Sequence, residues 1–307
     1  MKNKIFIIGV NGFLGSSLAK YFYNLNYEII GIDCTDHVSE STFASSMKYY
    51  KMQLPHADIT NVIKETMPDY LIYAAGSASV QNSFEMPHDD FYYSVNSLLT
   101  ILDNLRLHSR KTKVLFFSSA AVYGNAKKIP ISEECDLLPI SPYGYHKLIC
   151  EQILREYNDI YGVKSTVFRI FSVYGKGLHT RIFWDICQQV INDDIVQLGG
   201  SGDETRDFIN LKDFCEAVEL VLKRSSFNGE IYNLASGKEV RIAELAKLVL
   251  SAFGSNKELN FTTIIRKGDP FNWCADITAI QKLGFVPKIE ISQGINEYVK
   301  WFRETIK

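Results

Sequence analysis

The sequence predicts an α/β protein built around a doubly wound parallel sheet, with a smaller, mixed α/β region toward the C-terminus. Two observations support this fold class. Apolar, strand-like runs alternate with helical stretches through the first half of the chain, as right-handed βαβ crossovers require. The first of these runs also breaks into a glycine-rich turn that leads into a helix. The strand-like runs span residues 4–10, 27–32, 48–54, 69–75, 113–118 and 164–171.

The glycine-rich turn contains Gly9, Gly12 and Gly15. Gly9 allows the chain to turn off the strand, Gly12 has no Cβ to keep a phosphate away, and Gly15 allows close packing of the helix on the sheet. The first helical turn, with Phe13 and Leu14, presents free N–H groups and a partial positive charge. The spacing predicts a dinucleotide-binding turn of the Rossmann type, although an ordinary strand-to-helix turn is the alternative.

Further cofactor contacts are expected where the next strands end. The second run ends on Asp33, 18 residues after the last glycine of the turn. A carboxylate there meets a ribose 2′-hydroxyl and repels a 2′-phosphate, which favours NAD over NADP; a solvated loop aspartate is the alternative. Asp58 and Ile59 are a candidate adenine contact, and an N-cap role for Asp58 is equally open. Ala74 and Ala75 are small enough for a cofactor to lie against the backbone.

Composition limits the class of protein. The 307 residues are 46% hydrophobic, enough for one large domain or two interlocked ones. The formal net charge of −2 and the lack of a long basic run argue against nucleic acid and anionic membranes as partners. No apolar stretch is long enough to span a bilayer. Six scattered cysteines without a C-x-x-C pair, and histidines without ligand spacing, favour reduced thiols in a cytoplasm and no metal.

Seven short motifs occur in a fixed order along the chain. They are Gly-x-x-Gly-x-x-Gly at 9–15, Ser-Ser-x-x-Val-Tyr-Gly at 118–124, Pro-Tyr-x-x-x-Lys at 142–147, and the blocks at 169–175, 205–209, 232–237 and 266–269. Together they resemble the extended short-chain dehydrogenase/reductase family, in its nucleotide-sugar epimerase/dehydratase branch. The resemblance implies a Rossmann domain over 1–172, with part of 205–234 returning to it, and a region over 173–307 that mainly binds a nucleotide sugar.

Tyr143 and Lys147 are four residues apart and share one face of an expected helix. A phenol with a pKa of about 10 needs about 4 kcal/mol of stabilisation to act as a base near pH 7. An ammonium about 4 Å away supplies about that much before desolvation opposes it, and an oxidised nicotinamide adds a second charge. The resemblance implies that Tyr143 takes a proton from a sugar hydroxyl while hydride passes to the nicotinamide. It also implies that Ser119 bonds the reacting oxygen and that Lys147 holds the nicotinamide ribose.

Two alanines narrow the reaction. Family members that dehydrate a 4-keto sugar carry Asp-Glu directly after the catalytic hydroxyl residue, whereas this chain has Ala120 and Ala121. Methyl groups cannot shuttle a proton, so dehydration and decarboxylation are disfavoured. The leading expectation is an NAD-retaining 4-epimerase of a nucleoside-diphosphate hexose. The alternatives are an NAD(P)H-dependent reductase of a nucleoside-diphosphate 4-keto-6-deoxy sugar and, more remotely, a non-catalytic dinucleotide sensor. The base and the hexose stay open.

The resemblance places substrate contacts in the second half of the chain. Arg206 and Arg266 match arginines that grip the nucleotide diphosphate, and Asp269 matches a residue that meets its ribose. Ser172 stands where the family has an asparagine near the substrate phosphates. Trp273 matches a position that borders the C2 substituent of the sugar, and its bulk argues against an N-acetylated hexose.

The resemblance also implies a homodimer formed by two long helices, expected over 87–109 and 143–160. Phe91, Leu98 and Leu102 are candidates for that surface, but the same periodicity fits a helix that packs on the sheet. Other helices are expected over 12–26, 178–192, 241–253 and 291–306.

Overall fold

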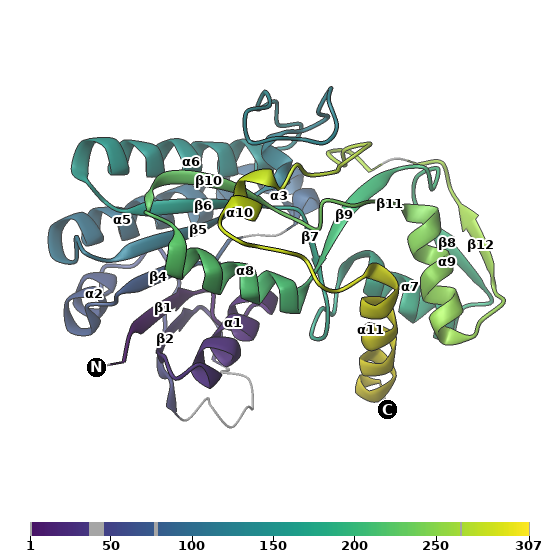
Figure 1. Ribbon diagram of the computed structural model, residues 1–307, viewed down its shortest axis with the longest axis horizontal. Helices are drawn as coiled ribbons and strands as arrows, with labels where there is room; N and C mark the ends of the chain where they lie inside the picture. The colour runs from purple at the N-terminus through teal and green to yellow at the C-terminus, as the bar shows by residue number, and fades with distance from the viewer. Residues whose placement is uncertain (1, 37–45, 77–78, 265, 307) are drawn as a thin grey trace. The chain divides into compact units, whose positions relative to one another are not determined.

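The computed structural model describes residues 2–36, 46–76, 79–264 and 266–306, which form two compact units (Figure 1). The first unit is Met1–Gly124, Leu137–Arg169 and Val218–Tyr232. The second unit is Asn125–Asp136, Ile170–Ala217 and Asn233–Lys307. Each unit therefore draws on segments that are far apart in the sequence.

A seven-stranded sheet organises the first unit. Its strand order is β10-β6-β5-β4-β1-β2-β3, and the neighbours β1–β2, β1–β4, β2–β3 and β4–β5 pair in parallel. The order reverses at β1, so a crevice forms beyond the carboxyl ends of β1 and β4. The predicted doubly wound fold and its six strands are confirmed. The strands are β1 Lys4–Ile8, β2 Glu28–Asp33, β3 Lys48–Lys51, β4 Tyr70–Tyr73, β5 Lys113–Ser119, β6 Ser165–Ile170 and β10 Asn228–Leu234.

Helices flank this sheet. The predicted helix over 87–109 is continuous in the chain but contains a π-helical turn at Tyr92–Asn96. The helix that carries Tyr143 begins where the Ser141 hydroxyl accepts a hydrogen bond from the Gly144 N–H at 3.1 Å, which caps its first turn. The α-helices are α1 Phe13–Asn24, α2 Ile59–Thr66, α3 Val80–Glu85, α4 Pro87–Phe91, α5 Ser97–His108 and α6 Pro142–Tyr161.

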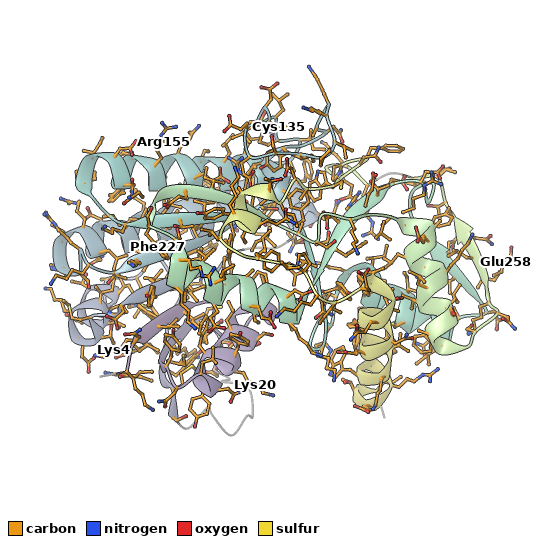
Figure 2. All side chains as sticks on the ribbon, viewed as in Figure 1. Lys4, Lys20, Cys135, Arg155, Phe227 and Glu258 are labelled. Carbon is orange, nitrogen blue, oxygen red and sulfur yellow. The ribbon has the colours of Figure 1, made fainter. Side chains whose placement is uncertain are left out.

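The apolar residues of α5 are expected either at a dimer surface or packed against the sheet, and their burial distinguishes the two. Leu98 and Leu102 are fully buried in the core cluster, so their periodicity serves packing and not an outer surface. Phe91, in contrast, is 38% exposed. Phe227, labelled in Figure 2, is also fully buried, and its ring lies 6.3 Å from that of Tyr70.

The second unit is mixed α/β, as predicted. Strands β11, β9 and β7 form one sheet, and β12 pairs in parallel with β8. The predicted helices over 178–192, 241–253 and 291–306 are confirmed as α7, α9 and α11. The elements are β7 Ser172–Tyr174, α7 Arg181–Asn192, β8 Ile195–Leu198, β9 Thr205–Asn210, β11 Glu239–Arg241, α9 Ile242–Phe253, β12 Glu258–Phe261, α10 Thr278–Lys282 and α11 Ile291–Thr305. Helix α8, Leu211–Arg224, contributes to both units. Within the described ranges, no helix has the length and apolar character needed to cross a bilayer.

Candidate active site

In the turn between β1 and α1, backbone segments approach each other so closely that two positions can hold only glycine. Gly9 has a φ of +84°, and a Cβ there would lie 2.8 Å from the backbone nitrogen of Ala75. A Cβ on Gly15 would lie 2.0 Å from the Gly9 carbonyl oxygen. At Gly12 the same atom would meet only the Gly9 oxygen, at 3.3 Å. The turn therefore packs directly on the end of β4 and leaves Gly12 open.

A cavity of about 560 Å³ lies against this turn, entirely within the first unit. Five of the predicted cofactor contacts line it: Gly9, Gly12, Asp33, Ala74 and Ala75. Helix α1 begins beside them with no side-chain cap and no acidic residue in its first turn. The N–H groups of that turn, which includes Phe13 and Leu14, are thus oriented to bind an anion.

The Asp33 carboxylate is fixed at the rim of the cavity. Its Oδ2 accepts a hydrogen bond from the backbone N–H of Asn11 at 2.9 Å. Its Oδ1 accepts from the backbone N–H and the hydroxyl of Thr35, each at 3.3 Å. The Cys34 thiol also donates to Oδ1, at 3.6 Å. These four donors hold the carboxylate in one orientation, and Oδ2, with a single donor, can still accept from a ligand hydroxyl.

The structure does not place Asp58 and Ile59 beside the cavity. Asp58 is exposed and makes no capping bond at the start of α2, while Ile59 is fully buried in the core. Because β3 ends at Lys51, the chain reaches the cavity at residues 52–54, and Gln53 is among the lining residues. Asp58 and Ile59 are not among the lining residues, and their contact with an adenine stays a prediction.

Ser119 is the last residue of β5. Its Oγ accepts a hydrogen bond at 3.1 Å from the backbone N–H of Ala121, within the 3₁₀ turn Ala120–Val122. Ala120 is fully buried and Ala121 is 8% exposed. The side chains that follow the serine are therefore packed methyl groups.

Tyr143 and Lys147 lie on successive turns of α6. The Tyr143 N–H donates to the Ser83 hydroxyl at 3.1 Å, which ties the start of α6 to α3. The Lys147 ammonium is 6% exposed and lies 5.8 Å from the centroid of the Tyr143 ring. It donates to the Phe117 carbonyl oxygen at 2.8 Å, two residues before Ser119. This hydrogen bond therefore joins α6 to β5, the strand that ends on Ser119.

Four predicted substrate contacts cluster in the second unit. The Arg206 guanidinium carbon lies 5.6 Å from the centroid of the Trp273 ring, whose edge also packs against Phe171. Burial raises the pKa of the Asp269 carboxyl above its ordinary value, and the charges of Arg206 and Arg266 oppose that rise. Ser172, at the start of β7, is half-buried opposite Phe208 of β9, and its role stays a prediction.

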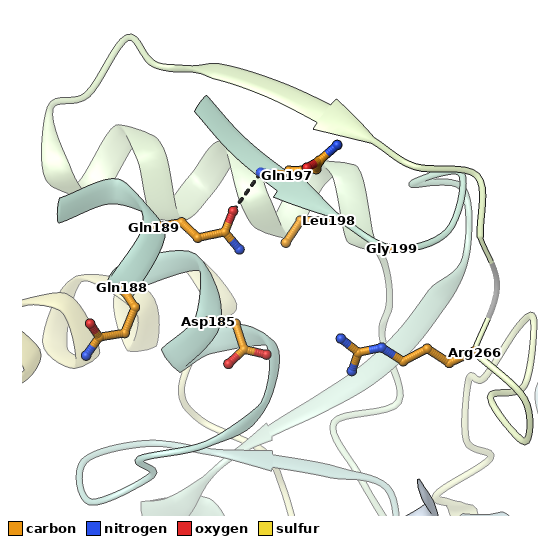
Figure 3. A pocket seen from close by; sticks show the side chains of 7 residues that line it. All are labelled: Asp185, Gln188, Gln189, Gln197, Leu198, Gly199 and Arg266. Atoms are coloured by element: carbon orange, nitrogen blue, oxygen red, sulfur yellow. Dashed lines mark hydrogen bonds between the residues drawn. The ribbon is translucent and has the colours of Figure 1, made fainter. Parts of the chain in front are cut away.

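A polar cavity of about 310 Å³ lies beside Arg266 in the second unit. Figure 3 shows the Asp185 and Arg266 side chains projecting toward each other across it. Burial raises the pKa of Asp185, and the Arg266 charge opposes the rise. Sequence reasoning found only the arginine, because a helix face of glutamines matches no motif. The lining residues are Asp185, Gln188, Gln189, Gln197, Leu198, Gly199 and Arg266.

Comparison with known proteins identifies the family. Residues 5–235 match the NAD dependent epimerase/dehydratase family. The chain belongs to this family. It is 26% identical to a putative UDP-glucose 4-epimerase of Methanocaldococcus jannaschii, across 97% of this chain and 98% of that protein. The resemblance that the motifs suggested is confirmed.

Two solved enzyme structures share the fold over nearly the whole chain. They are a UDP-N-acetylglucosamine 4-epimerase of Methanobrevibacter ruminantium and a UDP-glucose 4-epimerase of Thermotoga maritima. Each has a TM-score of 0.91 and 25% identity, and covers 99% of this chain and 100% of its own.

The cofactor that gives the family its name fits the first unit. The glycine turn leaves space for a pyrophosphate, α1 offers uncapped N–H groups, and Asp33 offers acceptors for ribose hydroxyls. Among the residues that the structure describes, no group of three or more His, Cys, Asp and Glu side chains is placed to hold a metal ion.

Proposed function

We propose that the protein is a nucleotide-sugar 4-epimerase that retains NAD. The observation that carries the proposal is that one unit contains Ser119, Tyr143 and Lys147. Ser119 is followed by two buried alanines at the positions where a dehydratase needs acidic side chains. Similarity to a putative UDP-glucose 4-epimerase and to two UDP-sugar 4-epimerases of known structure supports the same reaction type.

The first unit holds the cofactor in this proposal. The backbone at Gly9 and Gly12 and the first turn of α1 bind the pyrophosphate. Asp33 accepts hydrogen bonds from the adenine ribose, and its charge repels a 2′-phosphate, which selects NAD over NADP. When bound, the nicotinamide supplies the oxidation of the sugar C4 carbinol to a ketone and the return reduction.

The chain's own residues manage the proton. Tyr143 accepts the proton of the C4 hydroxyl as a phenolate and returns it after the sugar has presented its other face. The Lys147 ammonium stabilises that phenolate, and the Ser119 hydroxyl donates a hydrogen bond to the reacting oxygen. Ala120 and Ala121 offer no acid or base, so the keto sugar keeps its C6 hydroxyl.

The second unit binds the nucleotide in this proposal. Arg206 and Arg266 pair with the diphosphate, and Asp269 accepts from the ribose hydroxyls. The polar cavity beside Arg266 takes the nucleoside, since its amide and carboxylate groups match the polar edges of a base. Ser172 approaches the phosphates through its hydroxyl.

We also propose a homodimer in the cytoplasm. Exposed apolar side chains lie on the α4–α5 segment and on α6, which suits a helical interface. They include Phe91, Tyr92, Leu99, Tyr145 and Ile160. All six cysteines are free thiols, as a reducing compartment favours. Light scattering of the purified protein tests the dimer.

Purified protein tests the function directly. We expect an NAD-derived dinucleotide to stay bound through gel filtration, and UDP-glucose and UDP-galactose to interconvert without added cofactor. Tyr143→Phe should keep the bound dinucleotide and lose about 10²-fold to 10⁴-fold in turnover. Stoichiometric consumption of NADH or NADPH with a 4-keto-6-deoxy sugar nucleotide would show a reductase instead. Protein that keeps its bound dinucleotide but turns over no sugar nucleotide would refute the proposal that it is an enzyme.

A further inference from the structure

A buried charged pair lies behind the proposed catalytic helix, in the first unit. Glu151 of α6 and Arg169 of β6 have side chains that are 4% and 3% exposed. The Arg169 Nη2 donates to Oε2 at 2.8 Å, and its Nε lies 3.2 Å from each carboxylate oxygen. The other Arg169 nitrogen, Nη1, donates to the Tyr123 hydroxyl at 3.0 Å.

Glu151 also reaches the strand that carries the catalytic serine. The Ser118 hydroxyl donates to Glu151 Oε1 at 2.5 Å, directly before Ser119. One helical turn earlier, Lys147 binds the carbonyl oxygen of Phe117. Two successive turns of α6 therefore hold two successive residues of β5 by side-chain bonds. Both bonds help to fix where β5 ends relative to α6.

The charges of Arg169 and Glu151 cancel, whereas that of Lys147 is not cancelled by Glu151. Burial lowers the pKa of the Arg169 guanidinium, but the hydrogen bonds and charge of Glu151 outweigh burial and leave that pKa above its ordinary value. Arg169 is thus a permanent cation, and Glu151 cancels its charge. Lys147 is bonded to a carbonyl and not to a carboxylate, so Glu151 does not neutralise its ammonium. Another acidic group against this part of α6 is Asp90 of α4, whose Oδ2 lies 2.5 Å from Nδ1 of His146.

We propose that Glu151 is a positioning residue of the active site. Its bond to Ser118 fixes the end of β5 relative to α6, and its charge cancels that of Arg169 so that Arg169 adds no net charge behind Lys147 and Tyr143. This inference rests on the proposed function only in taking Tyr143 as the base. Glu151 does not touch substrate.

The charge of Glu151 is tested by titrating Tyr143 directly. Protein labelled with ¹³Cζ-tyrosine gives one signal that Tyr143→Phe removes, and its midpoint is followed by NMR. Glu151→Gln leaves the Arg169 charge uncompensated, so we expect the Tyr143 midpoint to fall, because an added positive charge favours the phenolate. Glu151→Gln combined with Arg169→Met removes both charges and should restore the midpoint. The double variant also leaves no charge buried alone, which keeps it foldable.

The positional role is tested by Ser118→Ala. We expect kcat to fall about tenfold with KM almost unchanged and the Tyr143 midpoint unmoved, because the charges stay in place. A midpoint that is equal in the wild type, Glu151→Gln and the double variant would overturn the inference, as would a Ser118→Ala enzyme with full kcat. Wild-type protein that turns over no sugar nucleotide refutes the proposed function alone, since the midpoints are measured without substrate.

Discussion

Gly15 stands so close to Gly9 that a Cβ on Gly15 would lie 2.0 Å from the Gly9 carbonyl oxygen. No side chain can be accommodated there unless the backbone of the turn moves. The approach of α1 to β1 is therefore set by backbone contact, and the cavity of the first unit depends on that contact for its shape.

Two alanine substitutions in this turn should separate folding from cofactor binding. Gly15→Ala is expected to force α1 outward and lower the melting temperature by several degrees, with loss of bound dinucleotide. Gly12→Ala meets only one atom, at 3.3 Å, so it should melt near the wild type and still bind dinucleotide about tenfold more weakly. Thermal melts and dinucleotide titrations check both. Equal melting temperatures for the two variants would contradict the packing argument.

Removing the Lys147 ammonium should affect both stability and chemistry. Lys147→Met keeps the length of the side chain but removes the buried hydrogen bond from the ammonium to the Phe117 carbonyl, at a cost of about 1–3 kcal/mol in unfolding free energy. We expect turnover to fall at least 10²-fold because the Tyr143 phenolate loses its cation. Urea unfolding and initial rates measure the two effects. Lys64→Met, at an exposed position in α2, is the matched control and should change neither.

Glu204 should make the second unit less stable in acid. Its carboxylate accepts from the N–H groups of Ser201 and Gly202, each at 2.9 Å, and these bonds outweigh burial and hold its pKa below the ordinary value. The stabilisation is complete above the ordinary glutamate pKa and is lost as pH falls through the lowered one. Glu204→Gln should therefore cost about 1–2 kcal/mol from pH 7 down to about pH 5, and progressively less as pH falls from about 4.5 to about 3.

Urea unfolding across that pH range tests the sign of this effect. Glu258→Gln, at the exposed side chain labelled in Figure 2, is the control and should show no such trend. A Glu204→Gln deficit that stays constant or grows in acid would show that the carboxylate charge does not stabilise the fold.

Trp273 should restrict the sugar. Its ring is fixed between the Arg206 guanidinium and Phe171, so it forms a rigid wall. We expect the wild type to prefer UDP-glucose over UDP-N-acetylglucosamine, and Trp273→Ala to shift the ratio of kcat/KM values about tenfold toward the acetylated sugar. Phe271→Ala, which removes a 48% exposed ring nearby, is the control. A wild-type preference for the acetylated sugar would refute this hypothesis.

The parts of the fold that could be predicted are those specified locally. A buried parallel strand is a continuous apolar run, and a helix that carries Tyr143 and Lys147 begins with Ser141 and Pro142 as its own signals. The π-helical turn at 92–96 was not predictable, because the pattern of apolar residues does not distinguish a turn of four residues from one of five.

Other features depend on contacts between distant segments. Strand β7 has only three residues and exists because it pairs with β9, more than 30 positions later, so its own sequence carries little strand signal. The sequence did not single out Met52, Gln53 and Leu54 as cavity-lining residues, because they follow β3 without a recognisable motif. The glutamines of the second cavity became visible only when α7 and β8 were placed in space.

The packed methyl groups after Ser119 also limit how this enzyme can change its chemistry. An aspartate and a glutamate at positions 120 and 121 would need room and hydration that the buried turn does not provide. Converting the protein to a dehydratase therefore takes more than the two acidic residues. The residues around the turn must first be replaced by smaller ones that admit water. Laboratory evolution toward elimination should therefore select these replacements first and the two acidic residues afterwards.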